Sequence, residues 1–191
     1  MHGASKGKDV KLRKEIAIAI KECMMHENLF GVLVSHGSST VPKYIVDEIN
    51  ALGGNIQNAY GISINELKAA IPCGIGKINV DTDIRLAVTR NMKEFFKNNP
   101  SKRDSASIGG VYQLLEEKKD QFDPRAFLPP IMDTVMYGTI QDDDTAALVE
   151  VIEKGVKEAI GTLIVEFGSF GKAPLVEQVS LEEMIERYKK M

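Results

Sequence analysis

Two spacings of apolar side chains alternate along the first hundred residues. Between residues 10 and 25 the spacing is helical and leaves one apolar face. Residues 29–37, LFGVLVSHG, form a short apolar run rich in β-branched side chains, typical of a buried parallel strand that ends in a loop. The run GKINVDTD at 76–83 predicts a second such strand. Further helices are predicted from residue 41 to the glycine pair at 53–54, at 64–70, and from Asp83, as the capping residue, to residue 98.

This alternation is the signature of parallel βα units, and it ends near Pro100. Beyond a polar loop at 101–107 only helices are predicted, at 109–122, 142–167 and 180–191, with a proline-interrupted segment at 123–135. We therefore expect an α/β fold in which residues 1–100 hold the βα units and residues 101–191 form a helical extension of the same domain. Two parallel strands do not close a sheet, and their open edges favour association with other chains.

Composition narrows the class of protein. The 191 residues carry a formal net charge of -3, which argues against a general nucleic-acid binder. No run approaches the roughly 18 apolar residues of a membrane span, and the N-terminus lacks a secretory pattern. Two cysteines, Cys23 and Cys73, are more typical of reduced thiols than of a disulfide framework. We expect a cytoplasmic protein that binds neither nucleic acid nor membrane.

Two of the three histidines, His2 and His36, each precede a glycine in a loop that offers serine or lysine. His36 follows the first predicted strand, and ligand residues gather at the carboxyl ends of parallel strands. A neutral imidazole there can bind zinc, and the neighbouring glycine and serine residues can present N–H groups to a phosphate. An isolated His-Gly pair is more often a simple turn. His26 lies in a helix-to-strand turn and is interpreted as a surface residue.

The second predicted strand ends in polar residues. Asn79, Asp81 and Asp83 alternate with the period of a strand and are therefore expected to share one face. Polar side chains on a buried face need partners, which favours a functional site. The alternative is a solvated strand end, with Asp83 only capping the next helix, and for Asp83 alone we prefer it. For Asn79 both interpretations stay open on this pattern alone.

Four collinear motifs resemble the class II fructose-bisphosphate aldolases: HGASKGK at 2–8, LVSHGSSTVP at 33–42, GGNIQNAYGIS at 53–63 and GIGKINVDTDIRLAVT at 74–89. The tail, FGSFGKA followed by SLEEMIERY, is similar to the ending of one long-form branch. The resemblance covers nearly the whole chain and is weakest at 101–162. It implies a (β/α)8 TIM barrel, of which this chain would hold strands seven and eight and the C-terminal helices.

The resemblance implies a metal site. His2 and His36 match two of the three histidines that hold the catalytic zinc in that family. A monovalent cation, Na⁺ or K⁺, is also expected near the two His-Gly turns. Zinc in such a site acts as a Lewis acid that polarises the ketone of fructose 1,6-bisphosphate before cleavage to dihydroxyacetone phosphate and glyceraldehyde 3-phosphate.

The resemblance also implies substrate-binding residues. Asn79 matches a strand-end asparagine that touches the reacting ketose and counts as catalytic. The other matched positions surround the phosphate and the substrate: Gly3, Lys6, Gly37, Ser39, Asp81 and Thr82. Three positions depart from the family pattern. Ser5 replaces a usual tyrosine, the second loop reads HGSSTVP, and Leu163 stands where an arginine is common.

The third zinc histidine and the neighbouring aspartate that donates a proton have no counterpart in this sequence. We therefore expect a fragment that needs the missing N-terminal half and shows no turnover alone, with homo-oligomers in the full-length family. The alternatives are a non-catalytic half-barrel that binds phosphate or a partner chain, and a fragment of a tagatose-bisphosphate aldolase.

Overall fold

The computed structural model describes residues 11–176 and 178–189. The first part of the described chain alternates between helices and two short strands, in this order: α1 (Lys14–His26), β1 (Leu33–Ser35), α2 (Lys43–Ala51), α3 (Ile64–Ala70), β2 (Ile75–Ile78) and α4 (Thr82–Asn98). Four helices follow, separated by short 3-10 turns: α5 (Gly109–Glu117), α6 (Met132–Tyr137), α7 (Asp143–Glu166) and α8 (Leu181–Lys189). The predicted order of helices and strands is thus confirmed in the described residues.

Both strands are shorter than predicted. They pair in parallel, with Leu33 opposite Ile75 and Ser35 opposite Ile78, and the register is irregular after Leu33. Each has only the other as a partner among the described residues, so neither strand extends beyond the range in which the two backbones pair. These residues form two strands and no closed barrel.

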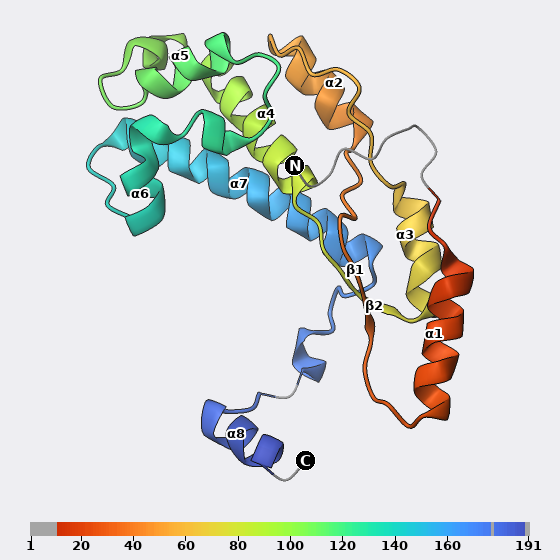
Figure 1. Cartoon of the computed structure of the whole chain (residues 1–191). Helices are drawn as coiled ribbons and strands as arrows, with labels where there is room; N and C mark the ends of the chain where they lie inside the picture. The colour runs from red at the N-terminus through yellow and green to blue at the C-terminus, as the bar shows by residue number, and fades with distance from the viewer. Residues whose placement is uncertain (1–10, 177, 190–191) are drawn as a thin grey trace.

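The sheet lies between two groups of helices (Figure 1). On one side α1 and α3 lie next to each other, joined by an ion pair of 2.7 Å between Lys14 Nζ and Glu66 Oε2. On the other side α4 and α7 run side by side and carry the larger share of the core. At their crossing, a Cβ atom added to Gly155 would lie 2.9 Å from Cα of Val88, so only glycine permits this approach.

The main core is built on α4 and α7 together with α5. Its fully buried members include Met92, Phe96, Leu115 and Leu148. A second cluster joins α2 to the first half of α4, centred on Ile49. Helix α4 belongs to both clusters, and because it starts directly after β2 it couples the sheet end to the helical region.

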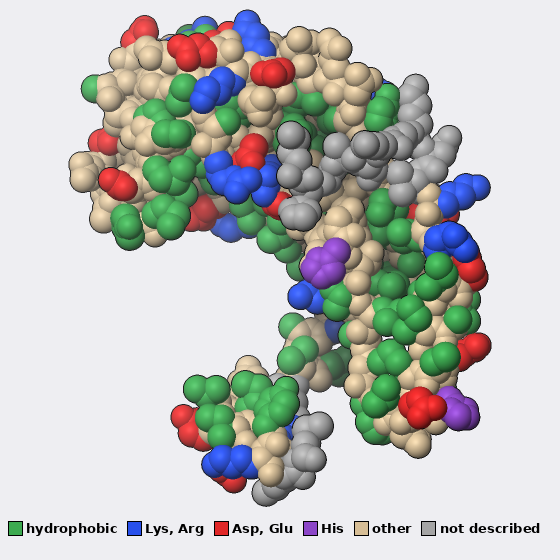
Figure 2. Space-filling model, in the orientation of Figure 1, with side chains coloured by type: hydrophobic (Ala, Val, Ile, Leu, Met, Phe, Trp, Pro, Cys, Tyr) green, Lys and Arg blue, Asp and Glu red, His purple; other side chains and the backbone are tan. Residues whose placement is uncertain are grey.

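Exposed hydrophobic side chains mark the parts of the molecule with few neighbours. Figure 2 shows them over the arm formed by α1 and α3 and over α8, which stands apart from the rest of the chain in Figure 1. In α1, Ile16 is 47% exposed, and in α8, Tyr188 is 71% exposed. Ser180 caps α8 by accepting a hydrogen bond from Glu183 N at 3.2 Å. None of the helices in the described ranges combines the length and apolar character needed to cross a bilayer.

Candidate functional site

The two strands deliver His36 and Asn79 to the same edge of the sheet. The ladder continues past the strand ends, because Asn79 N donates to Ser35 O at 2.9 Å and Ser38 N donates to Asn79 O at 3.2 Å. The side chains of His36 and Asn79 then meet, with Asn79 Nδ2 3.0 Å from His36 Nδ1. Parallel pairing is the cause, since it places the carboxyl ends of both strands together.

This contact couples the tautomer of the His36 ring to the orientation of the Asn79 amide. Where the amide nitrogen is the donor, Nδ1 is the acceptor and the ring proton is on Nε2. A metal ion needs a nitrogen lone pair, and here that lone pair faces Asn79. A metal ion that binds at Nδ1 would therefore displace the amide. A metal ion that binds at Nε2 would require the amide to turn its oxygen toward Nδ1, so that the ring proton moves to Nδ1 and Nε2 is free.

A cavity of about 600 Å³ opens beside this pair. Six of the residues that the sequence proposes as ligands or substrate contacts line it: His36, Gly37, Ser39, Asn79, Asp81 and Thr82. The other three, His2, Gly3 and Lys6, lie outside the described residues. The structure thus gathers every described member of the candidate set around one hollow.

The phosphate side of the cavity is built on the start of α4. Ser39 is buried, and its Oγ accepts hydrogen bonds from the backbone N–H groups of Asp81 at 3.2 Å and Thr82 at 3.0 Å. A serine hydroxyl that accepts two bonds still has its own proton to donate to an oxyanion. Gly37 adopts a left-handed backbone with φ of 64°, which turns the chain out of β1 at little steric cost. The carboxylate of Asp81 forms an ion pair with Arg85, in which Arg85 Nε donates to Asp81 Oδ1 at 2.8 Å.

The prediction that Asn79, Asp81 and Asp83 share one face is wrong. The strand ends at Ile78 and α4 begins at Thr82, so the period of two stops before it reaches the two aspartates. Asn79 contacts His36, Asp81 is exposed, and Asp83 is buried at 3% exposure.

Asp83 is also not the cap of α4, because Asp81 holds that position. Its carboxylate instead accepts three hydrogen bonds from Thr40 and Val41 in the loop after β1. Sequence reasoning missed this role, because only the fold brings residue 83 beside residue 40.

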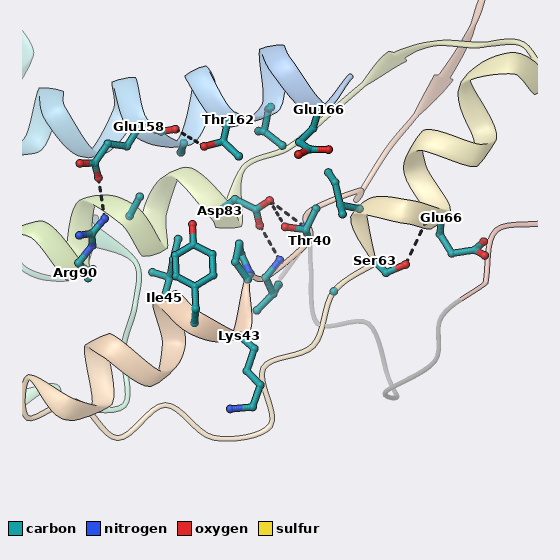
Figure 3. Close-up of a pocket in the computed structure, with 18 of the residues that line it drawn as sticks. Thr40, Lys43, Ile45, Ser63, Glu66, Asp83, Arg90, Glu158, Thr162 and Glu166 are labelled. Carbon is teal, nitrogen blue, oxygen red and sulfur yellow. Dashed lines mark hydrogen bonds and ion pairs between the residues drawn. The ribbon is translucent and has the colours of Figure 1, made fainter. Parts of the chain in front are cut away.

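A larger cavity of about 810 Å³ lies between α2, α3, α4 and α7 (Figure 3). Its polar lining is largely internally paired: Arg90 Nη2 contacts Glu158 at 2.7 Å, and Asp83 contacts Thr40. Leu163, which replaces the arginine common in the family, lines this cavity and not the one at His36.

The described residues contain no group of three or more His, Cys, Asp or Glu side chains placed to hold a metal ion such as zinc. His36 is exposed at the cavity and its imidazole is of the kind that binds zinc, so it fits the role of one zinc ligand.

Comparisons with known proteins agree with the sequence motifs. The family model described as fructose-bisphosphate aldolase class-II matches residues 1–172. The chain is similar to fructose-bisphosphate aldolases of Giardia intestinalis, with 34% identity over 98% of this chain and 45% of the relative, and of a Nostoc species, with 32% identity over 83% and 33%. It is also similar to the fructose-bisphosphate aldolase of Xanthobacter flavus, with 31% identity over 82% of this chain and 33% of the relative.

The chain therefore spans between a third and just under half of the length of these relatives. The match with the family model extends over most of this chain and includes both strand ends that line the cavity at His36. The chain belongs to the class II fructose-bisphosphate aldolase family.

Proposed function

We propose that this chain carries zinc- and phosphate-binding strand ends of a class II fructose-bisphosphate aldolase, as the seventh and eighth strands of a TIM barrel. The observation that carries the proposal is the contact between His36 Nδ1 and Asn79 Nδ2 at 3.0 Å, beside a cavity at the carboxyl ends of two parallel strands. Family membership supports the reaction, the reversible cleavage of fructose 1,6-bisphosphate.

In this proposal two histidines hold the zinc ion. His36 supplies one zinc ligand, and His2 supplies a second. When bound, zinc polarises the ketone of the substrate as a Lewis acid. Asn79 orients the imidazole and touches the ketose, and a monovalent cation lies near the His-Gly turns.

The phosphate of dihydroxyacetone phosphate is held between the loop after β1 and the start of α4. Ser39 donates its hydroxyl proton to a phosphate oxygen, and Gly37 brings backbone close to it. Asp81 and Thr82 complete this side, with Gly3 and Lys6 contributed by the N-terminal loop. The positive end of the α4 dipole favours the phosphate dianion at this place.

Calorimetric titration with Zn²⁺ tests the metal part of the proposal. Replacing His36→Ala should lower zinc affinity by about tenfold or more, since a lost ligand is at least as costly as a lost outer-shell partner. His26→Ala is the matched control, because His26 is an exposed histidine in contact with its neighbour Glu27 at 3.0 Å, away from the cavity at His36. Equal effects of the two substitutions would contradict the proposal.

Nuclear magnetic resonance with dihydroxyacetone phosphate tests the phosphate part. The amide signals of Gly37, Asp81 and Thr82 should shift on titration. Shifts confined to the larger cavity around Arg90 would overturn this assignment. Replacing Ser39→Ala should weaken the response, because its hydroxyl faces the cavity at the start of α4.

A second candidate function is a non-catalytic module that binds phosphate or a partner chain. It is favoured by the Ser39 hydroxyl and the start of α4 beside the cavity at His36, which can bind a phosphate without a metal ion. Cleavage of fructose 1,6-bisphosphate by the purified chain, abolished in His36→Ala and kept in His26→Ala, would exclude it.

If the chain binds phosphate without turnover, the nucleotide sequence upstream of the Met1 codon separates the two candidates. A reading frame there for the first six strands supports the aldolase. Tagatose 1,6-bisphosphate in the same assay decides between the two sugars, and analytical ultracentrifugation tests the homo-oligomer expected from the family.

A further inference from the structure

Asp83 is a buried carboxylate whose hydrogen bonds all go to one loop. It is 3% exposed and lies in the first turn of α4. Its Oδ2 accepts from Thr40 N at 3.0 Å and Thr40 Oγ1 at 2.8 Å, and its Oδ1 accepts from Val41 N at 2.7 Å (Figure 3). These donors belong to the loop that starts at His36.

The backbone that Asp83 holds is strained. Val41 has φ of 48°, in the left-handed region that a β-branched residue rarely enters. It also precedes Pro42, and residues before proline favour extended conformations. Val41 is nevertheless buried, at 7% exposure. A conformation disfavoured twice by local sterics persists only where tertiary contacts impose it, and the bond from Val41 N to Asp83 is such a contact.

The opposite side of the loop is fixed by the segment before α3. Ile62 N donates to Ser39 O at 3.0 Å. A Cβ atom at Gly61 would lie 2.4 Å from Ser39 O and from the carbonyl of Thr40, so the two segments touch through backbone alone. The loop is clamped between this segment and Asp83.

The clamp extends to the candidate site through Ser39. While Asp83 accepts from Thr40 and Val41, Ser39 accepts from the N–H groups of Asp81 and Thr82. The loop after β1 and the start of α4 are therefore tied reciprocally, each satisfying the other's backbone donors. Asp83 itself lines the larger cavity and not the one at His36, so it acts on the site only through these partners.

We propose that Asp83 is a positioning residue that locks the loop from His36 to Val41 in its strained form and thereby orients His36 toward Asn79. This proposal rests on the proposed aldolase function for its purpose, but its structural content is independent of metal or substrate. If Asp83 only filled space, an amide in place of its carboxylate would change little. If Asp83 orients the loop through its three hydrogen bonds, the amide matters, because it has one accepting oxygen and would turn an N–H₂ group toward Thr40 or Val41.

The experiment compares Asp83→Asn with Asp47→Asn as the control. Asp47 is an exposed carboxylate on α2 whose partner among the described residues is Lys43. Asp83→Asn should speed hydrogen exchange at the Thr40 and Val41 amides by about tenfold or more, the effect of losing a charge-assisted hydrogen bond. The ¹⁵N signals of the His36 ring should move from a single tautomer toward the average of both. Asp47→Asn should leave both readouts unchanged.

A second substitution keeps the proposal testable if Asp83→Asn folds poorly. Glycine enters the left-handed region freely, so Val41→Gly removes the strain that Asp83 holds. Combined with Asp83→Asn, Val41→Gly should restore folding and return the His36 ring signals toward those of the wild type. Additive effects of the two changes would overturn the proposal, as would an unchanged His36 spectrum in a folded Asp83→Asn protein.

Different results contradict the positioning role of Asp83 and the proposed aldolase function. A wild-type chain that binds neither Zn²⁺ nor dihydroxyacetone phosphate contradicts the aldolase assignment, yet leaves the exchange and ring-nitrogen readouts intact. Normal zinc affinity and normal His36 signals in Asp83→Asn would instead sink the positioning role alone.

Discussion

The side-chain nitrogen of Asn79 lies 3.0 Å from Nδ1 of His36, although 43 residues separate the two along the chain. The contact exists because β1 and β2 are parallel and their ladder continues beyond the strand ends. It joins a residue proposed to bind zinc to one proposed to touch the ketose. Their geometry is therefore shared, and a change in one is expected to appear in the other.

Replacing Asn79→Ala should release the His36 ring. Without the amide donor no other described side chain holds Nδ1, so both tautomers of the ring become populated. The measurement is a ¹⁵N–¹H spectrum of the imidazole, in which the two ring nitrogens should move toward a common value. Asn65→Ala, an exposed substitution on α3, is the control. A spectrum unchanged by Asn79→Ala would contradict the assigned hydrogen bond.

Two glycines of α7 should respond oppositely to the same substitution. Gly155→Ala places a methyl group 2.9 Å from the backbone of Val88 in α4, and the helices must separate. We expect a loss of about 1–3 kcal/mol in the free energy of unfolding, the usual cost of overpacking. Gly161→Ala meets no atom within 4 Å, so it should stabilise α7 by up to about 1 kcal/mol through helix propensity. Urea denaturation followed by circular dichroism measures both, and equal signs would refute the α4–α7 contact.

Gly61→Ala should disturb the loop that carries His36. The added methyl group would lie 2.4 Å from backbone atoms of Ser39 and Thr40, which cannot rotate away as a side chain could. A destabilisation of about 1–3 kcal/mol is expected, together with faster exchange of the Ile62 amide, which donates to Ser39 O. Hydrogen exchange monitored by mass spectrometry locates the change. Protection lost only near α5 would show that the contact lies elsewhere.

Acid should weaken the fold through Asp123. A hydrogen bond from the Arg125 side chain, followed by one from the Arg125 backbone and by the charge of Arg85, holds the pKa of this carboxyl below its ordinary 3.8. A carboxyl whose folded pKa is lowered stabilises the protein above the unfolded value and loses that contribution as pH falls through the folded one. Stability should therefore drop as the pH is taken below about 4.

The comparison with Asp123→Asn isolates this contribution. At neutral pH the variant should be less stable than the wild type, and the gap should close as the pH falls below 4, measured by thermal denaturation across the range. Asp120→Asn, at an exposed neighbouring carboxylate, should follow the wild type. A stability difference between the two proteins that grows as the pH falls would contradict the lowered pKa of Asp123.

Some features of this protein are determined locally and were predictable. The order of helices and strands follows from apolar periodicity, which depends on neighbours a few residues away. The cap at Ser180 follows from the same kind of short-range chemistry. The candidate ligands could be named because their motifs resemble a family, and the fold brings six of them to one cavity. The roles of all nine candidates stay predictions, and three of them, His2, Gly3 and Lys6, lie outside the described residues.

Other features depend on which segments meet, and only the tertiary structure decided them. The strand ends shortened because a strand extends only as far as its partner. Asp83 looked like a helix cap, yet it became the buried acceptor for a loop 42 and 43 residues earlier in the chain. Val41 adopts a left-handed backbone conformation, although its own β-branched side chain and the following Pro42 both disfavour it. Local sterics set what each residue prefers, whereas long-range hydrogen bonds and close backbone contacts determine where those preferences are overruled.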